Sequence, residues 1–184
     1  MLRLTLLALP LLAACASQPP AETARLPRDA VLGAGDPARS AVFSTNAVFA
    51  QRSPAAGHPA EAARAIAQME FLAVDLPQNT NLSSPSPTLV PELATARAEW
   101  REVLGIASDA PAQPVINALF AAGRALDAGQ VDAAASALPN SIFRKGGAAT
   151  VSQLAALPRL PRTAMAAATA QQSLQGVTGG RLAL

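Results

Sequence analysis

The stretch at residues 89–105, LVPELATARAEWREVLG, decides the fold class. Its apolar residues recur three and four positions apart, which is the spacing that places side chains on one face of an α-helix. Gly105 follows as the expected helix stop, and Pro91 has to lie in the first turn or mark a kink. The stretch therefore predicts a helix that packs through one apolar face. The residues of this face are Leu89, Leu93, Ala96, Trp100 and Val103.

Charged residues border this predicted face. In helical projection, Glu92 and Glu99 lie along one edge, and Arg97 and Arg101 lie along the other. Charges of opposite sign on the two edges help to select which neighbouring helix packs on which side. Glu99 and Glu102 are the closest pair of acidic residues, and we expect both to face solvent.

Two helices are predicted before this one. Asp36 can cap the first, and Pro37 suits its first position. The second covers residues 59–76, and Phe71 lies off its main stripe, which predicts a second contact surface. The first helix takes its apolar bulk from Val42, Phe43 and Phe49. The stripe of the second consists of Ala62, Ile66, Met69, Ala73 and Leu76, and its polar face consists of Glu61, Arg64, Gln68 and Asp75.

Further helices are predicted after it. We expect Asp109 to cap a helix over residues 110–129, and a short helix at 131–138 to return along it as a hairpin. Thr150 is expected to cap another short helix, and residues 163–175 form the last one.

Composition agrees with an all-α class. The chain is 51% hydrophobic and only 3% aromatic, and alanine is its commonest residue, which favours helices. We predict a single irregular bundle of about five to seven helices over residues 36–176, with a loose tail at 177–184. Residues 119–139 faintly resemble a tetratricopeptide unit, but a solenoid needs several copies, so we interpret them as a simple hairpin.

The first residues predict an export signal. Arg3 precedes an apolar run at residues 4–12, and the small residues Ala13 and Ala14 follow. A membrane-spanning helix needs about 20 apolar residues, roughly twice the length of this run. We therefore interpret residues 1–14 as a signal peptide.

The residues Leu12-Ala13-Ala14-Cys15 resemble the lipobox of bacterial lipoproteins, and Cys15 is the only cysteine. The resemblance implies that the Cys15 sulfur receives a diacylglyceryl group. It also implies that the signal is cut before Cys15 and that the new amino terminus is acylated, for example with palmitate. Two or more acyl chains hold a protein stably at a bilayer. Ala16 is not the aspartate that retains some lipoproteins in the inner membrane, so the resemblance favours the periplasmic face of the outer membrane.

Ordinary secretion is the alternative. Ala14-Cys15-Ala16 also fits a small-x-small cleavage pattern, which would release a soluble periplasmic protein. We favour lipidation, because it leaves no free thiol in an oxidising compartment. Residues 16–34, ASQPPAETARLPRDAVLGA, are rich in proline and mixed charge. We predict that residues 15–35 comprise the lipidated cysteine and a flexible tether.

Charge is distributed unevenly along the chain. All 12 acidic residues lie between Glu22 and Asp132, whereas residues 133–184 carry only basic ones. The two parts either pack against each other, which we favour, or the basic part contacts an anionic component such as a phospholipid headgroup, lipopolysaccharide or cell-wall polymer. In FRKGGAAT, residues 143–150, cationic side chains precede a helix start whose N–H groups could meet an anion. The candidate anion-binding residues are Arg144, Lys145, Gly146, Gly147, Arg159 and Arg162.

The sequence lacks the usual patterns of catalysis. With one histidine, His58, and one cysteine, it cannot assemble a thiolate or imidazole metal site. We find no nucleophile elbow and no glycine-rich phosphate loop, so we predict no enzyme activity, metal or cofactor. Basic residues without interleaved aromatic residues also argue against nucleic acid as a partner.

These observations predict a non-enzymatic interaction or structural role at the periplasmic membrane surface. The partners would be the membrane, through the acyl chains on Cys15, and an envelope protein. The alternative is a binding module for an anionic envelope component, and a hydrolase that uses His58 ranks third.

Overall fold

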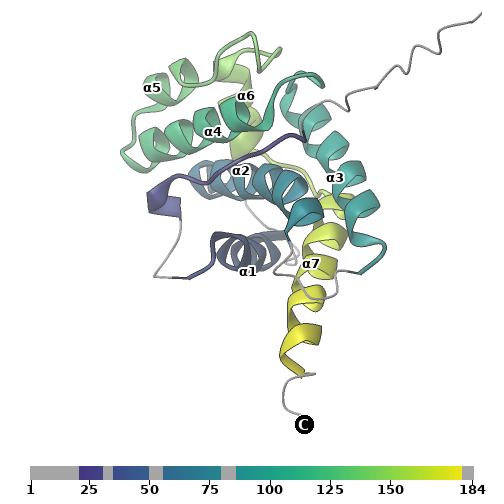
Figure 1. Cartoon of the computed structure of the whole chain (residues 1–184). Coiled ribbons are helices and arrows are strands. Elements are labelled where there is room, and N and C mark those ends of the chain that lie inside the picture. Colours follow the sequence, from purple (N-terminus) through teal and green to yellow (C-terminus); the bar gives the residue numbers. More distant parts are fainter. Residues whose placement is uncertain (1–20, 31–34, 50–55, 80–85, 180–184) are drawn as a thin grey trace, which may run out of the picture.

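The structure, a computed structural model, describes residues 21–30, 35–49, 56–79 and 86–179 (Figure 1). Its α-helices are α1 (Pro37–Phe49), α2 (Pro59–Asp75), α3 (Leu89–Leu104), α4 (Ala112–Asp127), α5 (Val131–Ser136), α6 (Gly147–Ala155) and α7 (Pro161–Gly179). Two short 3-10 helices, η1 (Arg28–Ala30) and η2 (Leu76–Gln78), complete the set of described helices. The predicted all-α bundle of about five to seven helices is confirmed.

Helix α2 lies at the centre and packs against α1, α3, α4 and α6 (Figure 1). Most of its 17 residues are buried, and many are alanines, whose small side chains let the neighbouring helices approach on several sides. Phe71 is buried, which confirms the predicted second contact surface. Gln68 was expected on a polar face and is buried too, because α1 and α4 approach the same side of α2.

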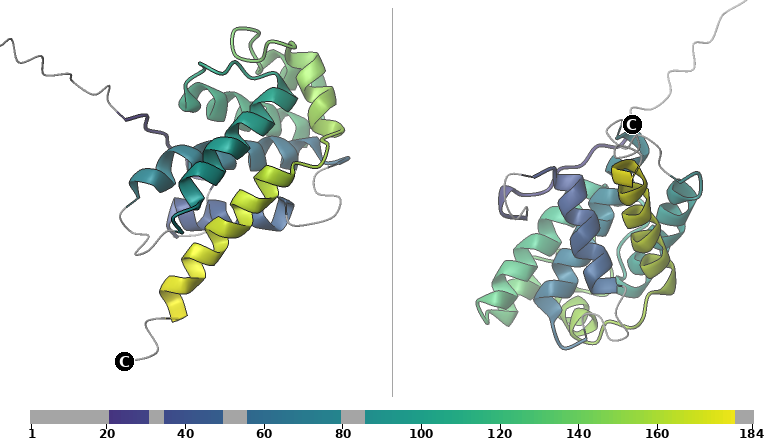
Figure 2. Two further views of the ribbon diagram at one scale, coloured as in Figure 1. Left: turned by 90° about the vertical axis from the view of Figure 1, so that its right-hand side faces the viewer. Right: turned by 90° about the horizontal axis from the view of Figure 1, so that it is seen from below.

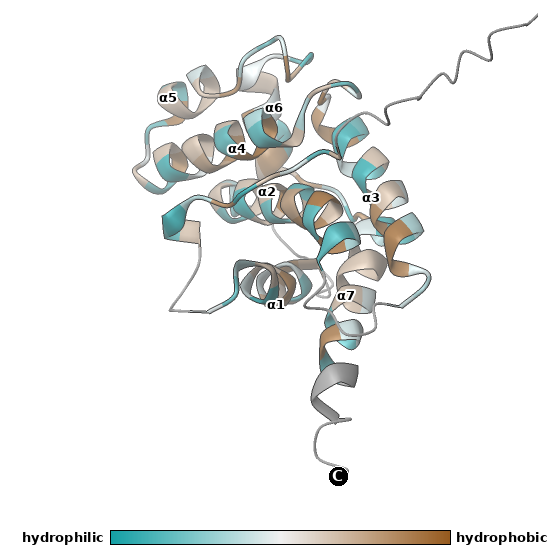
Figure 3. Ribbon diagram, in the orientation of Figure 1, coloured by the Kyte–Doolittle hydropathy of each residue, from teal (hydrophilic) through white to brown (hydrophobic). Residues whose placement is uncertain are grey.

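Helix α3 has the predicted apolar face. Leu89, Leu93, Ala96 and Trp100 are fully buried, and Gly105 ends the helix in the left-handed region at φ 68°. Leu104 is buried more completely than Val103, so the face turns slightly at its end. Hydrophobic and hydrophilic segments alternate along α3 and α4, as one-sided packing requires (Figure 3).

Helix α7 packs against α1 and α3, and its last turns project beyond the other helices (Figure 2). It begins at Pro161 and continues to Gly179, so residues 177–179 are helical rather than part of a loose tail. Residues 180–184 of the predicted tail lie outside the described residues.

The predicted cap of α1 is confirmed. The backbone N–H of Ala38 donates to Asp36 Oδ1 over 2.8 Å, and Pro37 occupies the first helical position. Of the residues expected to supply apolar bulk, Val42 and Phe49 are buried, whereas Phe43 is 44% exposed. Phe43 therefore falls on the outer face of α1.

Two other predicted caps are wrong. Asp109 lies ahead of α4 without capping it, and the N–H of Ala112 instead donates to Glu22 Oε1 over 2.6 Å. Helix α6 begins before Thr150, whose buried hydroxyl donates to the carbonyl of Gly146 over 2.9 Å. At α4, a residue distant in sequence replaces the local cap. At α6, the helix begins earlier than the predicted cap.

Gly147 begins α6 where this helix crosses α5. A Cβ atom at this position would overlap with the backbone carbonyl of Ala135. Only glycine therefore allows the two helices to approach this closely.

We expect the Gly147→Ala variant to lose about 1 to 3 kcal/mol of unfolding free energy, the usual cost of forcing extra volume into packed structure. Urea unfolding followed by the fluorescence of Trp100, the single tryptophan, measures this. Gly35→Ala is the matched control, because a Cβ there meets nothing within 4 Å. An equal effect of the two substitutions would contradict the packing argument.

Candidate functional site

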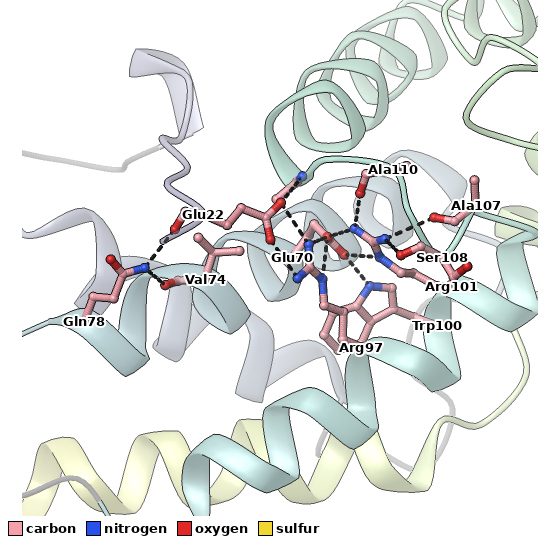
Figure 4. A network of polar contacts seen from close by, with 11 residues as sticks. Glu22, Glu70, Val74, Gln78, Arg97, Trp100, Arg101, Ala107, Ser108 and Ala110 are labelled. Carbon is pink, nitrogen blue, oxygen red and sulfur yellow. Dashed lines mark hydrogen bonds and ion pairs between the residues drawn. The ribbon is translucent and has the colours of Figure 1, made fainter. Parts of the chain in front are cut away.

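A buried carboxylate connects α2 to α3 (Figure 4). Glu70 on α2 is 0% exposed, and it accepts hydrogen bonds from Trp100 Nε1 over 2.9 Å and from Arg97 Nε over 2.8 Å. Arg101 forms an ion pair with the same carboxylate. We call Glu70, Arg97, Trp100 and Arg101 the charge cluster.

Arg101 extends the charge cluster to the connection between α3 and α4. Its guanidinium donates to the carbonyls of Ala107 and Ser108 over 3.1 Å each, and to that of Ala110 over 2.9 Å (Figure 4). These bonds hold the connection against the helices, so one side chain joins two helices and a loop.

The charge cluster is closed around Glu70, which is fully buried. Removing charge from water costs several kcal/mol per ion unless it is paired and hydrogen-bonded, and Glu70 and Arg101 meet both conditions. Its donors are used within the protein, which leaves no open position at Glu70 for a substrate or a metal. We therefore assign it a structural role.

Residues 22–30, which we call the strap, meet the charge cluster at its outer edge. The Glu22 carboxylate accepts from Arg97 Nη1 over 2.9 Å, and Gln78 Nε2 donates to the Glu22 carbonyl over 2.8 Å (Figure 4). Partial burial raises the Glu22 pKa, but hydrogen bonds from Arg97 and from the Ala112 N–H, with the charges of Arg97 and Arg101, outweigh it and hold the pKa below its usual value.

The rest of the strap follows α4. The Gln113 side chain accepts from Arg25 N over 2.7 Å and donates to Arg25 O over 3.0 Å. Asp29 pairs with Arg124 over 3.1 Å. The strap lies within the predicted tether at residues 15–35, so this part of the predicted tether is bound to the bundle. Partners far along the chain, which composition does not reveal, hold it there.

The predicted anion-binding residues at 144–147 contact other parts of the chain or shape the start of α6. Arg144 pairs with Asp109 over 3.3 Å at the surface, and Lys145 Nζ donates to the carbonyl of Val103 over 2.8 Å at the end of α3. Gly146 has φ 84° and precedes α6, and Gly147 serves the contact of α6 with α5 described above.

Arg159 and Arg162 are exposed near the start of α7. The backbone N–H groups there are already engaged, because Thr163 N donates to Glu99 Oε2 over 2.9 Å and Arg162 N to Glu99 Oε1 over 3.3 Å. Glu99 was expected to face solvent with Glu102, and it instead caps α7 from another helix. The structure thus spreads the predicted anion-binding residues over two helix starts.

His58 lies at the cap position of α2 and lines a cleft of about 650 Å³ between α1, α2 and α4. Arg64 and Gln68 line the same cleft, and Arg64 is paired with Asp127.

Within the described ranges, no group of three or more His, Cys, Asp or Glu residues could hold a metal ion. Leu12, Ala13, Ala14 and Cys15 lie outside the described residues.

A scan against protein-family models, a search of curated proteins and a search of solved structures each found no match to this chain. Among the helices that the structure describes, none is long and apolar enough to cross a membrane.

Sequence reasoning missed the charge cluster and the strap contacts, although one signal was available. Glu70 is a single acid within AIAQMEFLAV, residues 65–74, and an acid in such an apolar helix is usually buried with a partner. The partners Arg97 and Arg101 were recognised only as edges of their own helix.

We expect Glu70→Gln to lower the unfolding free energy by about 3 to 5 kcal/mol, because it leaves the buried Arg101 guanidinium without its counter-charge. Urea unfolding followed by Trp100 fluorescence measures the loss. Glu102→Gln is the control, since it removes an exposed carboxylate from the same helix as Arg97 and Arg101. A loss below about 1 kcal/mol would show that the charge cluster contributes little.

Stability should also depend on pH through Glu22. Because its folded pKa is lowered, the stabilisation is fully present above the unfolded value and is lost as pH falls through the folded pKa. The difference in unfolding free energy between the unmodified chain and Glu22→Gln should be about 0.5 to 1 kcal/mol near neutral pH, as for a partly exposed ion pair. It should shrink below about pH 4.5. A difference that grows with acidity would reverse the assigned sign.

Proposed function

We propose that this chain is a lipid-anchored protein of the cell envelope with a non-enzymatic interaction or structural role at the periplasmic face of the outer membrane. The lipobox-like residues Leu12 to Cys15 support the anchor. The strap supports the role at the surface, because it determines where the chain leaves the helical bundle.

The attachment of Glu22 is the observation that carries this proposal. Glu22 is bound to Arg97 and to the start of α4, and it follows Cys15 by seven residues. Seven residues span at most about 25 Å when fully extended. A lipid on Cys15 would therefore keep the middle of α3 and the start of α4 near the bilayer.

The contacts of the charged residues favour interaction over catalysis. The side chains of Glu70 and Arg101 are hydrogen-bonded within the protein, and Glu99 caps α7. A partner at the membrane would then bind to the outer surface of the helices. Binding of an anionic component stays an alternative prediction, now with Arg144 and Lys145 engaged in contacts of their own.

We expect Cys15→Ser to abolish acylation. The mature protein should move from the detergent phase to the aqueous phase and should lose the mass of the acyl chains, measured by Triton X-114 partitioning and intact-mass spectrometry. Unchanged mass and partitioning would contradict the anchor.

The same variant tests the alternative. Salt-sensitive binding of the Cys15→Ser protein to vesicles containing anionic lipid would favour the anion-binding module, provided that reversal of Arg144 and Lys145 to glutamate removes it. For the partitioning and mass experiment on the anchor, Ala16→Ser is the control, because it alters a neighbouring small residue and keeps the thiol.

A further inference from the structure

The strap is bound through its main chain as well as its side chains. The Gln113 amide forms paired hydrogen bonds with the backbone N–H and C=O of Arg25, at 2.7 and 3.0 Å. A side-chain amide that pairs with both backbone groups of one residue selects an extended peptide, with little regard to the side chain there.

A carboxylate seat lies three residues before this point. Arg97 Nη1 and Nη2 lie 2.9 and 3.4 Å from the Glu22 carboxylate, and the Ala112 N–H at the start of α4 lies 2.6 Å from it. Arg97 supplies charge, and the helix start supplies an N–H group that favours an anion. The Glu22 side chain is 39% exposed, so the seat opens to solvent.

The strap lies along a surface that we call the groove, defined by the residues that bond to it. These residues are Gln78, Arg97, Ala112, Gln113 and Arg124. Most of the strap's own side chains stay exposed there. None of its residues is fully buried, and its apolar contacts come from Ala24, Leu26 and Ala30, which are only partly buried. Beside it, a cleft of about 460 Å³ is lined by Leu26, Pro27, Gln113 and other residues of the strap and α4. The groove therefore has room for larger side chains than the strap supplies, and segments with few buried contacts open locally at low cost.

We infer that the groove formed by Gln78, Arg97, Ala112, Gln113 and Arg124 is a docking site for an extended acidic peptide segment of a partner protein, and that the strap is its intramolecular occupant. The inference rests on the proposed interaction role for its biological setting. The partner segment would place a carboxylate three residues before the residue that pairs with Gln113. It would displace the strap.

Competition with the strap makes the inference measurable. A tethered segment has an effective concentration in the millimolar range, so it masks the groove from a free peptide. Weakening the strap within the chain should unmask the groove without altering the residues that form it.

The probe is a fluorescently labelled synthetic peptide with the sequence of residues 21–30, AETARLPRDA. Fluorescence anisotropy at low salt compares its binding to the full mature chain and to Glu22→Ala, both carrying Cys15→Ser. We expect the Glu22→Ala chain to bind the peptide about tenfold more tightly than the chain with the unmodified strap does. Adding Gln113→Ala should reduce that binding about tenfold, and so should replacing the glutamate of the peptide by glutamine.

Arg39→Ala in the Glu22→Ala background is the matched control, since it removes an exposed cation of α1, outside the groove, and should leave binding unchanged. Arg25→Pro is a second way to weaken the strap, because proline lacks the backbone N–H that donates to Gln113 Oε1. Circular dichroism and Trp100 fluorescence confirm that each variant is folded.

No binding to either strap-weakened chain, or binding that is indifferent to Gln113→Ala, overturns the inference. The assay contains no lipid. Its failure is therefore distinguishable from failure of the anchor, which the Cys15→Ser partitioning experiment reports.

Discussion

The Glu70 carboxylate is the constraint on which the arrangement of this bundle depends. It is fully buried on the central helix α2, where the guanidinium groups of α3 offset the cost of burying its charge. A hydrophobic contact tolerates sliding, whereas a buried ion pair is costly as soon as its partners separate. Glu70 therefore sets how α2 and α3 align, and Arg101 carries the constraint on to the connection before α4.

An alanine-rich bundle has particular need of such a constraint. Its helices present small, smooth faces, and with 3% aromatic residues the chain has few large side chains to interlock. Close approach compensates, as at Gly147, where α6 reaches the backbone of α5. Directional bonds then supply the specificity that shape alone gives weakly. We regard the charge cluster and the Glu99 cap on α7 as two examples of this device.

Arg97 connects this interior to the surface. It faces the buried Glu70 on one side and Glu22 on the other, and burial lowers its pKa less than these two carboxylates raise it. The same side chain thus joins the core to the strap. In the proposed function, the strap continues within a short length of chain to the lipid-bearing cysteine. The lipid anchor would then be linked through the strap and Arg97 to the core of the bundle.

The sequence by itself determined the helical class, the apolar face of α3, the cap at Asp36 and the stop at Gly105, because each depends on residues within about one helical turn. It also carried the anchor prediction, which rests on residues outside the described part of the chain. Tertiary structure alone decided the charge cluster, the seat of Glu22 and the cap by Glu99. Glu70 meets Arg97 across 27 residues, and Glu22 meets Ala112 across 90, separations at which periodicity carries no information. Local patterns report which face of a helix is apolar, but which charges meet depends on how the helices pack.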